Sequence, residues 1–482
     1  MHAGQQEKAN GGSTVARRIW LFFPMTALLI LAGCGGGSSA SSGYGSGVVG
    51  GGGGGGSGSG GGSSPAAVTV DFGTADQVIR GFGGSTAFLG ALTAPQAKAL
   101  FSPADGLGLS ILRVRIDPSG SAGNQWVTSQ WTDELTNAQQ AEADNPNALV
   151  FASPWTPPVA WKTSSTSQPY YSGSPACPHA GLCGGYLDPA HYADYASYLE
   201  DFVQYFQSNG ITLYGISMQN EPDYSAAAGQ NYESCSWTPA QMDTWVANDA
   251  STLTTKLIMP ESYGFNPAQA EPTLNDPNAV GKVAIVAGHL YGSQPSYYTQ
   301  AENLGKDVWM TEHYLTPAAG AGSQPDMADA LSAAEEIHNS MVTGQYNAYV
   351  WWWVWNDPND NVNYGLIDSS TANPQPTFYG DALGQFSRFI QPGYHRYNAT
   401  ANPSSNVYVS AYAGSNHYVI VAINAGSAAL NQTFNLQNAT VTSMTPWQTT
   451  SAGGLQQQSA VTVSGGSFTY SLPAQSITTF VQ

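Results

Sequence analysis

The stretch YGISMQNEPDY, residues 214–224, starts with the pattern of a β-strand and ends in residues that suit the end of one. Tyr214, Ile216 and Met218 alternate with smaller or polar neighbours, which is the two-residue period of a half-buried strand. The next five residues, QNEPD, contain two amides, two carboxylates and a proline that cannot donate to a sheet ladder. The pattern therefore predicts a strand that ends here and leaves Glu221 at its carboxyl end.

Seven further apolar segments of strand length accompany this one. In chain order, the eight segments are Val78 to Ser85, Ile111 to Asp117, Ala148 to Trp155, Leu213 to Asn220, Lys256 to Ser262, Val283 to Tyr291, Asp307 to Tyr314 and Asn347 to Val354. Between them lie segments such as Tyr192 to Ser208 and Met327 to Met341, in which apolar residues recur at intervals of three and four. Repeated alternation of strand and helix predicts an α/β fold of the (β/α)8 TIM-barrel type over residues 78–393.

After about Tyr394 the pattern changes to short alternating runs separated by Gly, Asn and Ser. The runs are NVYVSAY, HYVIVAIN, TFNLQ, SFTYSL and ITTFVQ. They predict an attached antiparallel β-sandwich, a side domain over residues 394–482. The run AVTVDF, residues 67–72, precedes the barrel, and we expect the segment 66–77 to add an N-terminal strand to this side domain.

The first 65 residues have the composition of an export signal followed by a tether. Lys8, Arg17 and Arg18 precede an apolar run over residues 19–32, which is shorter than the roughly 20 residues of a transmembrane helix. The run ends in LAGC, which resembles the bacterial lipobox, so we expect a lipoprotein signal peptide over 1–33 and lipidation of Cys34. An ordinary signal peptide is the alternative.

Residues 34–65 are rich in Gly and Ser and are typical of a flexible linker. Together with the signal they predict an exported protein. We expect it in the bacterial cell envelope or at the cell surface, held to a membrane through a lipid anchor at Cys34, or released extracellularly.

Composition limits the partners and the redox state. With 13 Lys+Arg against 32 Asp+Glu, the net charge of -19 argues against a nucleic-acid partner, because no basic patch could neutralise phosphates. Export favours oxidation, so we expect one disulfide among Cys177, Cys183 and Cys235 and one free thiol. Cys177 with Cys183 would close the shortest loop, but the sequence does not choose the pair. A zinc site with His179 or His191 is an alternative whose spacing matches no common zinc pattern.

A second glutamate occupies a position like that of Glu221. The segment DVWMTEHY ends the seventh predicted strand with Glu312, beside Tyr314. Because the active site of a TIM barrel lies at the carboxyl ends of its strands, the two glutamates would face each other across the barrel axis. Such a pair suits glycoside hydrolysis, in which one carboxyl protonates the leaving oxygen and the other attacks or stabilises the sugar centre. For either glutamate alone, a solvated place in a loop is the alternative.

The motifs QNEPD, WMTEHY, ASPWTPP, GHLYG and YVWWW, in this order at predicted strand ends, resemble glycoside hydrolase family 30. The resemblance extends from about residue 66 to residue 482, includes the terminal LPAQSITTFVQ, and is closest to subfamily 8 of bacterial xylanases. It implies a retaining endo-β-1,4-xylanase that acts on xylan of plant cell walls. Carboxylates suffice for that reaction, so no metal or organic cofactor is expected. We expect a monomer, although the sequence does not define the oligomeric state.

The resemblance also implies roles for individual residues. It makes Glu221 the general acid/base, Glu312 the nucleophile, Asn220 a sugar contact and Tyr291 a hydrogen-bond partner of the nucleophile. Arg113 on the second strand would hold Glu312 ionised, with a buried structural ion pair as the alternative.

Aromatic side chains are expected to supply platforms for sugars. Trp155 and Trp353 match family positions that line the cleft, and Tyr314 flanks Glu312. By period-two alternation, Trp352 points away from Trp353 and packs under the helices. His289 shares a face with Tyr291 and is expected in the cleft, with a hydrogen-bonded structural histidine as the alternative.

The chain departs from the family in the loop after the eighth strand. The best-known relatives grip a glucuronic acid branch there with an arginine, but residues 351–387 contain no Lys or Arg and instead include Asp357, Asp360 and Asp368. We therefore expect a xylanase that does not require glucuronate. Lys162, after the third strand, is the candidate for a replacement cation.

Two other functions stay open on the sequence. One is hydrolysis of another β-glycan, such as a β-1,6-linked glucan or galactan, since the missing arginine leaves room for a different substrate. The other is a non-catalytic surface lipoprotein that binds polysaccharide, which would leave Glu221 and Glu312 without a role.

Overall fold

The computed structural model describes residues 66–118, 120–121, 125–126, 131–171, 177, 181–224, 232–356, 363–368 and 372–482. The predicted signal peptide and linker with Cys34 lie outside the described residues, as do His179, Asp357 and Asp360.

Eight parallel strands close into a barrel, which confirms the predicted fold class. The strands are β2 (Gly81–Ser85), β3 (Ile111–Ile116), β6 (Leu149–Pro154), β11 (Gly215–Ser217), β12 (Lys256–Ser262), β13 (Val283–His289), β14 (Asp307–His313) and β15 (Ala348–Trp353). Each strand lies within one of the eight predicted segments. Gly83 lets β2 approach β3 closely, because a Cβ at this position would lie 2.0 Å from the backbone oxygen of Ile111.

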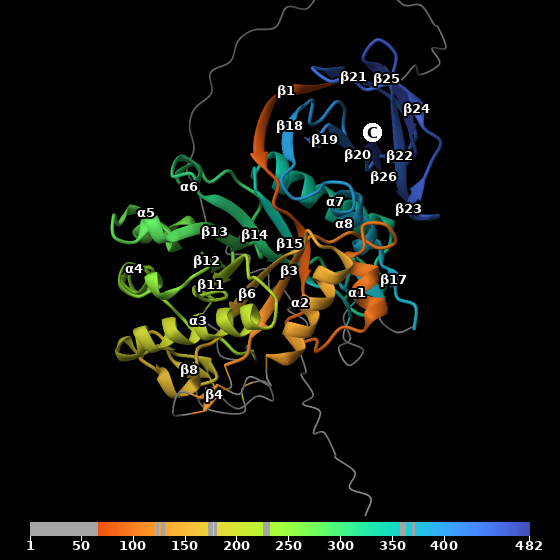
Figure 1. Ribbon diagram of the computed structural model, residues 1–482. Helices are drawn as coiled ribbons and strands as arrows, with labels where there is room; N and C mark the ends of the chain where they lie inside the picture. The colour runs from red at the N-terminus through yellow and green to blue at the C-terminus, as the bar shows by residue number, and fades with distance from the viewer. Residues whose placement is uncertain are drawn as a thin grey trace, which may run out of the picture.

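One α-helix follows each barrel strand and covers the outside of the barrel (Figure 1). The helices are α1 (Ala94–Phe101), α2 (Thr132–Asp144), α3 (Tyr192–Ser208), α4 (Pro239–Asn248), α5 (Glu271–Asn275), α6 (Thr299–Asn303), α7 (Met327–Val342) and α8 (Phe378–Ser387). The two helices predicted individually are α3 and α7. Alternation along the strands sorts the core into two layers: Leu112 and Val114 face the helices, whereas Ile111 belongs to the cluster that fills the barrel interior.

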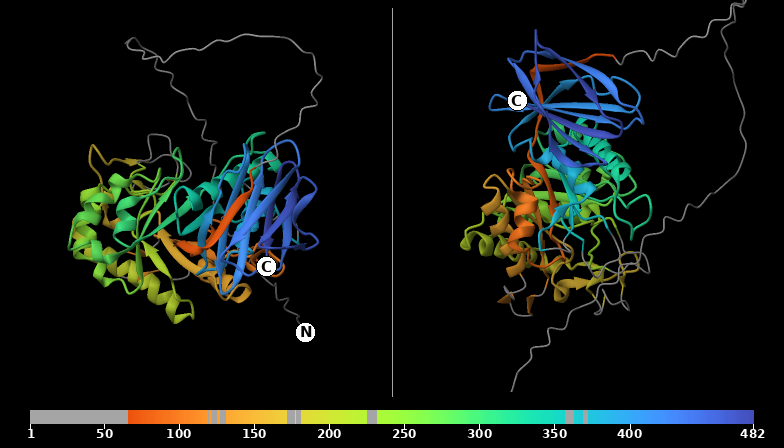
Figure 2. Two further views of the ribbon diagram at one scale, coloured as in Figure 1. Left: turned by 90° about the horizontal axis from the view of Figure 1, so that it is seen from above. Right: turned by 90° about the vertical axis from the view of Figure 1, so that its right-hand side faces the viewer.

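Ten strands form the side domain. They are β1 (Val68–Val78), β18 (His395–Ala399), β19 (Val407–Gly414), β20 (His417–Asn424), β21 (Leu430–Gln437), β22 (Ser443–Thr450), β23 (Gly453–Gln457), β24 (Val461–Thr462), β25 (Ser467–Leu472) and β26 (Ser476–Val481). The sheet folds over so that its halves face each other (Figure 2), and Phe434 of β21 lies 5.2 Å from Phe480 of β26 between ring centroids. This domain confirms the predicted antiparallel side domain, and within its otherwise antiparallel sheet β1 pairs parallel with β21.

Helices α7 and α8 lie between the barrel and the side domain (Figure 1). Gln385 of α8 donates to Thr449 Oγ1 at 2.8 Å, and its backbone oxygen accepts from Thr479 Oγ1 at 2.7 Å. Because these bonds are buried, they hold the last barrel helix against β22 and β26.

Short strand pairs order the loops at the carboxyl ends of the barrel. They are β4 (Gly120–Ser121) with β5 (Gln125–Trp126), β7 (Lys162–Thr163) with β10 (Tyr186–Leu187), β8 (Tyr170–Tyr171) with β9 (Cys183–Gly184), and β16 (Ile367–Asp368) with β17 (Gln375–Pro376). A disulfide joins Cys177 to Cys183 in the loop between β6 and α3, and Cys235 is a buried free thiol. Both sulfurs of the pair are thereby used, which excludes the zinc site that would have drawn on them.

Among the residues that the structure describes, no helix combines the length and the apolar character needed to cross a membrane.

Strand β1 lies between β18 and β21, and we expect the side domain to require it. Val70 is fully buried on β1, so Val70→Asp should lower the free energy of unfolding by about 3 kcal/mol or more, because it buries an unpaired carboxylate. Denaturant unfolding of the chain from Ala66 onward measures this. Thr74→Asp, at an exposed position of the same strand, is the control, and equal losses for both variants would contradict the placement of β1.

Candidate active site

Five charged side chains meet at the carboxyl ends of five barrel strands. Arg113 comes from β3, Glu261 from β12, His289 from β13 and Glu312 from β14, while Glu221 follows β11. Arg113, Glu261 and His289 are fully buried, and Glu221 and Glu312 are each 5% exposed. The structure thus brings both predicted glutamates into one buried cluster, with a third carboxylate that the sequence analysis did not single out.

A β-bulge turns Glu312 into the barrel. Gly288 pairs with Met310 but His289 pairs with Glu312, so β14 carries one extra residue there, and the register with β15 shifts at the same place. Val308 and Met310 face the helices, and strict alternation would place Glu312 on their side. The bulge resets the alternation, so that the Glu312 carboxylate points inward.

Glu261 and Glu221 are placed by unusual backbone conformations. Glu261 is the extra residue of a bulge in β12, where Pro260 pairs with Ala287 and Ser262 with Gly288. Its φ of 53° and the φ of 45° at Glu221 lie in the left-handed region that side chains other than Gly rarely adopt. The backbone N–H of Glu221 donates to the backbone oxygen of Glu261 at 3.0 Å, which connects the two segments. Strain of this kind concentrates at functional sites.

Both oxygens of Glu312 accept hydrogen bonds. Arg113 Nη1 donates to Oε2 in a buried ion pair, and Tyr291 Oη donates to Oε1 at 2.9 Å. Burial raises the pKa of Glu312, and the positive charges of His289 and Arg113 oppose this rise. The carboxylate is therefore held in one orientation beside a permanent cation.

Both oxygens of Glu221 are also engaged. His289 Nδ1 lies 2.9 Å from Oε1, and Tyr232 Oη donates to Oε2 at 2.9 Å. Burial by itself favours neutral His289, but the negative charges of Glu312 and of the other two glutamates raise the pKa of His289 to about 9. His289 is therefore an imidazolium at neutral pH and donates to Glu221.

Three side chains of this cluster lie close enough together to be considered as ligands of a metal ion. Donor atoms of Glu221, His289 and Glu312 all lie within 4.8 Å of one another. An imidazolium offers no lone pair to a metal, however, and Glu312 is already paired with Arg113. The cluster therefore favours acid–base chemistry over metal binding.

The remaining predicted residues surround this cluster. Asn220 accepts a hydrogen bond at Oδ1 from Arg113 at 2.6 Å, and its amide nitrogen has no hydrogen-bond partner among the described residues. The face of Trp155 lies 4.6 Å from the Arg113 guanidinium. Trp353 donates from Nε1 to the Ala87 oxygen at 2.8 Å. Trp155 and Trp353 are almost fully buried, at 2% and 3% exposure, so they expose little surface to a ligand.

The prediction for Trp352 was wrong. Its ring packs on Trp155, with 5.7 Å between ring centroids, and lies 6.0 Å from the Arg113 guanidinium. Trp352 continues the inward positions Ala348 and Val350, so it faces the site. Trp351 instead faces the helices and packs on Tyr379 of α8. A register shift between β15 and β2 brings Trp353 beside Trp352, so simple alternation fails at this strand end.

Aromatic rings form a continuous belt beside the charged cluster, and we call these residues the aromatic belt. In order they are Tyr224, Tyr263, Tyr291, Tyr314, Tyr364, Trp353, Trp352, Trp155 and Phe88. Successive ring centroids are 4.2 to 5.7 Å apart. The belt includes the predicted Tyr314 and places aromatic rings beside polar groups, a combination typical of sugar-binding clefts.

Sequence reasoning missed three contacts of the cluster. Glu261 had a signal, since it ends the fifth predicted strand in the motif PES just as Glu221 ends the fourth in NEP. Ser153, which donates to Glu261 at 2.7 Å, and Tyr232, which donates to Glu221, had none. Tyr232 lies in a loop without apolar periodicity, and only the fold brings it to the site.

The replacement cation proposed for glucuronate is not free. Lys162 is buried, and its Nζ donates to Thr156 Oγ1 at 2.6 Å and to the Ser234 oxygen at 2.8 Å. Burial lowers the pKa of Lys162 to about 8. Lys162 therefore links two loops and does not reach a ligand.

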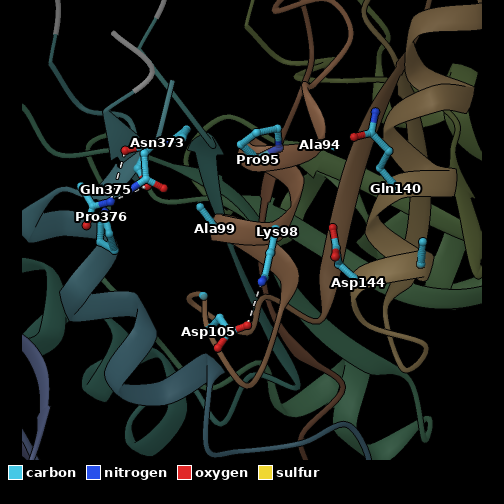
Figure 3. Close-up of a pocket in the computed structure, with 13 residues that line it drawn as sticks. Ala94, Pro95, Lys98, Ala99, Asp105, Gln140, Asp144, Asn373, Gln375 and Pro376 are labelled. Carbon is cyan, nitrogen blue, oxygen red and sulfur yellow. Dashed lines mark hydrogen bonds and ion pairs between the residues drawn. The ribbon is translucent and has the colours of Figure 1, made fainter. Parts of the chain in front are cut away.

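A separate groove lies on the outer flank of the barrel, between α1, α2 and residues 373–376 (Figure 3). No predicted site residue lines it. Lys98 and Asp105 pair with each other there at 2.9 Å, as Figure 3 shows. The two carboxylates that line the groove, Asp105 and Asp144, both interact with Lys98, unlike the buried glutamates at the barrel mouth.

Within the barrel, residues 128–363 match the family model of the glycosyl hydrolase family 30 TIM-barrel domain. The glucuronoxylanase XynC of Bacillus subtilis strain 168 is 38% identical over 422 residues, which cover 86% of this chain and 91% of that protein.

Solved structures of family 30 xylanases are also similar to this chain. The family 30 subfamily 8 xylanase Xyn30A of Clostridium acetobutylicum superposes with a TM-score of 0.75 at 43% identity, and covers 86% of this chain and 99% of its own. A family 30 endoxylanase of Clostridium papyrosolvens C71 gives a TM-score of 0.74 at 39% identity, with the same coverage of 86% and 99%.

The raised pKa of His289 predicts a pH-dependent stability. Because the folded value of about 9 exceeds the ordinary 6.5, the contribution of the imidazolium is complete below pH 6.5 and is lost as the pH rises through 9. We expect His289→Gln to destabilise the protein more at pH 6 than at pH 9.5, by a difference on the order of 3 kcal/mol. Urea unfolding of both proteins at both pH values measures it. An equal effect at the two pH values would contradict a charged His289.

Proposed function

Because the chain belongs to glycosyl hydrolase family 30, we propose that it is a retaining endo-β-1,4-xylanase with Glu221 as general acid/base and Glu312 as nucleophile. The observation that carries the mechanism is the proximity of the two carboxylates, which have oxygens within 4.8 Å of each other. Retaining enzymes hold the two carboxyl groups about 5 to 5.5 Å apart, whereas inverting enzymes need roughly 6.5 to 9.5 Å to admit a water.

The contacts suit a double displacement. Glu312 attacks the anomeric carbon and forms a glycosyl ester, while Glu221 gives its proton to the leaving oxygen. Glu221 then takes a proton from water, which attacks the same carbon and releases Glu312 as a carboxylate. Arg113 and Tyr291 keep Glu312 in one orientation, and Asn220 lies beside both glutamates with an amide nitrogen available to a sugar hydroxyl.

The charges of the site balance when Glu221 is protonated. Arg113 and His289 supply two positive charges, and ionised Glu261 and Glu312 supply two negative charges. The proposed role of Glu221 as general acid requires a proton on it before the first step, and the cluster is neutral in that state.

We infer further that the enzyme does not need a glucuronate branch. Of the 13 Lys and Arg residues of the chain, only Arg113, Arg115 and Lys162 lie at the carboxyl ends of the barrel strands within the described residues. Arg113 and Lys162 are engaged as described. Arg115 Nε and Nη2 each donate to Glu233 at 2.6 Å, and Nη1 donates to Asp117 at 2.7 Å.

A glucuronate carboxylate would therefore meet no unengaged cation in this part of the chain. Loss of a charge-assisted bidentate partner is worth roughly 1.5 to 3 kcal/mol. This reading departs from the name of the Bacillus subtilis relative, which is a glucuronoxylanase. The sequence of the first 65 residues supports export and anchoring through Cys34 as a further part of the proposal.

Glu221→Gln and Glu312→Gln should each lower kcat on xylan about a thousandfold, because they remove the proton donor and the nucleophile. On an aryl xyloside whose leaving group needs no protonation, Glu221→Gln should keep rapid formation of the glycosyl enzyme, and Glu312→Gln should not. Steady-state and burst kinetics measure this. Glu271→Gln, an exposed glutamate on α5, is the matched control. A wild-type protein that binds xylan but never cuts it would refute the enzyme and favour the polysaccharide-binding alternative.

The masses of the products test which polysaccharide the enzyme cuts and whether it needs a glucuronate branch. The chain from Ala66 onward should convert linear xylan, arabinoxylan and glucuronoxylan to short oligomers, with a neutral ladder from linear xylan. Products that all carry one glucuronate would contradict glucuronate independence. No products from any xylan would favour a β-1,6-linked glucan or galactan, for which the relatives at 38 to 43% identity offer less support.

A further inference from the structure

Glu261 is a buried carboxylate that contacts both cations of the site. Its Oε1 lies 3.2 Å from Arg113 Nη2 and 3.9 Å from His289 Nε2, and its Oε2 accepts from Ser153 at 2.7 Å. Each cation in turn reaches one reacting glutamate: Arg113 pairs with Glu312, and His289 lies 2.9 Å from Glu221. Glu261 is thus connected to both glutamates through these two cations, and with 0% exposure it cannot touch a substrate.

The far side of His289 faces Glu261. The ring atom Nδ1 faces Glu221, whereas Nε2 is buried and has no hydrogen-bond partner in the described part of the chain. Oε1 of Glu261 is likewise buried without a hydrogen bond. An imidazolium N–H that is buried without an acceptor is costly, so a negative charge 3.9 Å away is the interaction that compensates it.

We propose that Glu261 is a positioning residue that keeps His289 in its imidazolium form and thereby keeps a cation 2.9 Å from the Glu221 carboxyl group. This inference rests on the proposed roles of Glu221 and Glu312. It is supported by the backbone as well, because the bulge and the positive φ at Glu261 serve no pairing in the sheet and turn the side chain toward the two cations.

Other groups also face His289, and the two reacting glutamates among them do not keep a constant charge. The titratable and charged groups around its ring are Glu221, Asp223, Glu261, Tyr291, Glu312 and Arg113. In the proposed reaction Glu221 passes from acid to carboxylate as Glu312 passes from carboxylate to ester. Glu261 keeps its negative charge in both states, because Arg113 overcomes the effect of burial and lowers the pKa of Glu261 to about 2.

This constancy keeps the cluster neutral through the reaction. Before the first step Glu261 and Glu312 balance Arg113 and His289; in the glycosyl enzyme Glu261 and Glu221 balance the same two cations. No net charge is created or removed in a buried site, which lowers the cost of the step.

The test compares wild type with Glu261→Gln, which keeps the shape and removes the charge. In protein labelled with 15N-histidine, with His289 assigned through His289→Gln, we expect its imidazolium signal to titrate lower in Glu261→Gln by about one pH unit or more. Glu261→Asp keeps the charge but withdraws it from Nε2, and should give an intermediate shift. It also serves as the test variant if Glu261→Gln does not fold. An unchanged His289 titration in the variant that folds would overturn the proposal.

Kinetics supply a second readout. In the pH profile of kcat/KM, the fall in activity at high pH (the high-pH limb) marks the loss of the proton from the general acid. In Glu261→Gln the adjacent imidazolium loses its proton at a lower pH, so we expect this limb to move to higher pH, with kcat reduced about tenfold or more and KM nearly unchanged. In the His289→Gln background, Glu261→Gln should leave the limb in place.

A lower kcat with an unmoved limb would show a merely structural role and overturn the inference. Failure of the proposed function would look different: Glu221→Gln and Glu312→Gln would retain activity, whatever the titration of His289 shows.

Discussion

The ion pair between Arg113 and Glu261 is the interaction on which the rest of the site depends. Both side chains are fully buried at the barrel mouth, where they come from β3 and β12, and neither could stay charged there alone. Once paired, the guanidinium has donors left for Glu312 and Asn220, and its face packs on Trp155. One buried pair therefore orients the Glu312 carboxylate, an amide and an aromatic wall.

A barrel is well suited to tolerate the free-energy cost of burying these charges. Its lower interior is filled by Ile111, Phe151, Ile285, Trp309 and Val350, and this apolar layer stabilises the fold without help from the site. The charged residues occupy the next inward positions above that layer. Bulges in β12 and β14 add residues only at the strand ends, where the loss of ladder pairing is small. The buried charges and the bulges are thus confined to the mouth of the barrel, at the carboxyl ends of its strands.

Loops at the carboxyl ends of the barrel strands hold residues of the charged cluster in place. Tyr232 reaches Glu221 from the loop after β11, and Lys162 ties that loop to the one after β6 through Ser234. The disulfide between Cys177 and Cys183 closes a short turn in the same region. Lys162, the cation that the sequence suggested for a substrate carboxylate, is used instead to hold two loops together.

The sequence by itself determined the eight strands, the alternating helices and the position of Glu221 and Glu312 at strand ends, because each depends on local periodicity and on chain order. The tertiary structure decided which way those ends point. A bulge turns Glu312 inward, another brings Glu261 to Arg113, and strand parity sends Trp352 to the site. Register between strands is a non-local property, since it depends on neighbours distant in sequence, and one extra residue reverses every side chain beyond it.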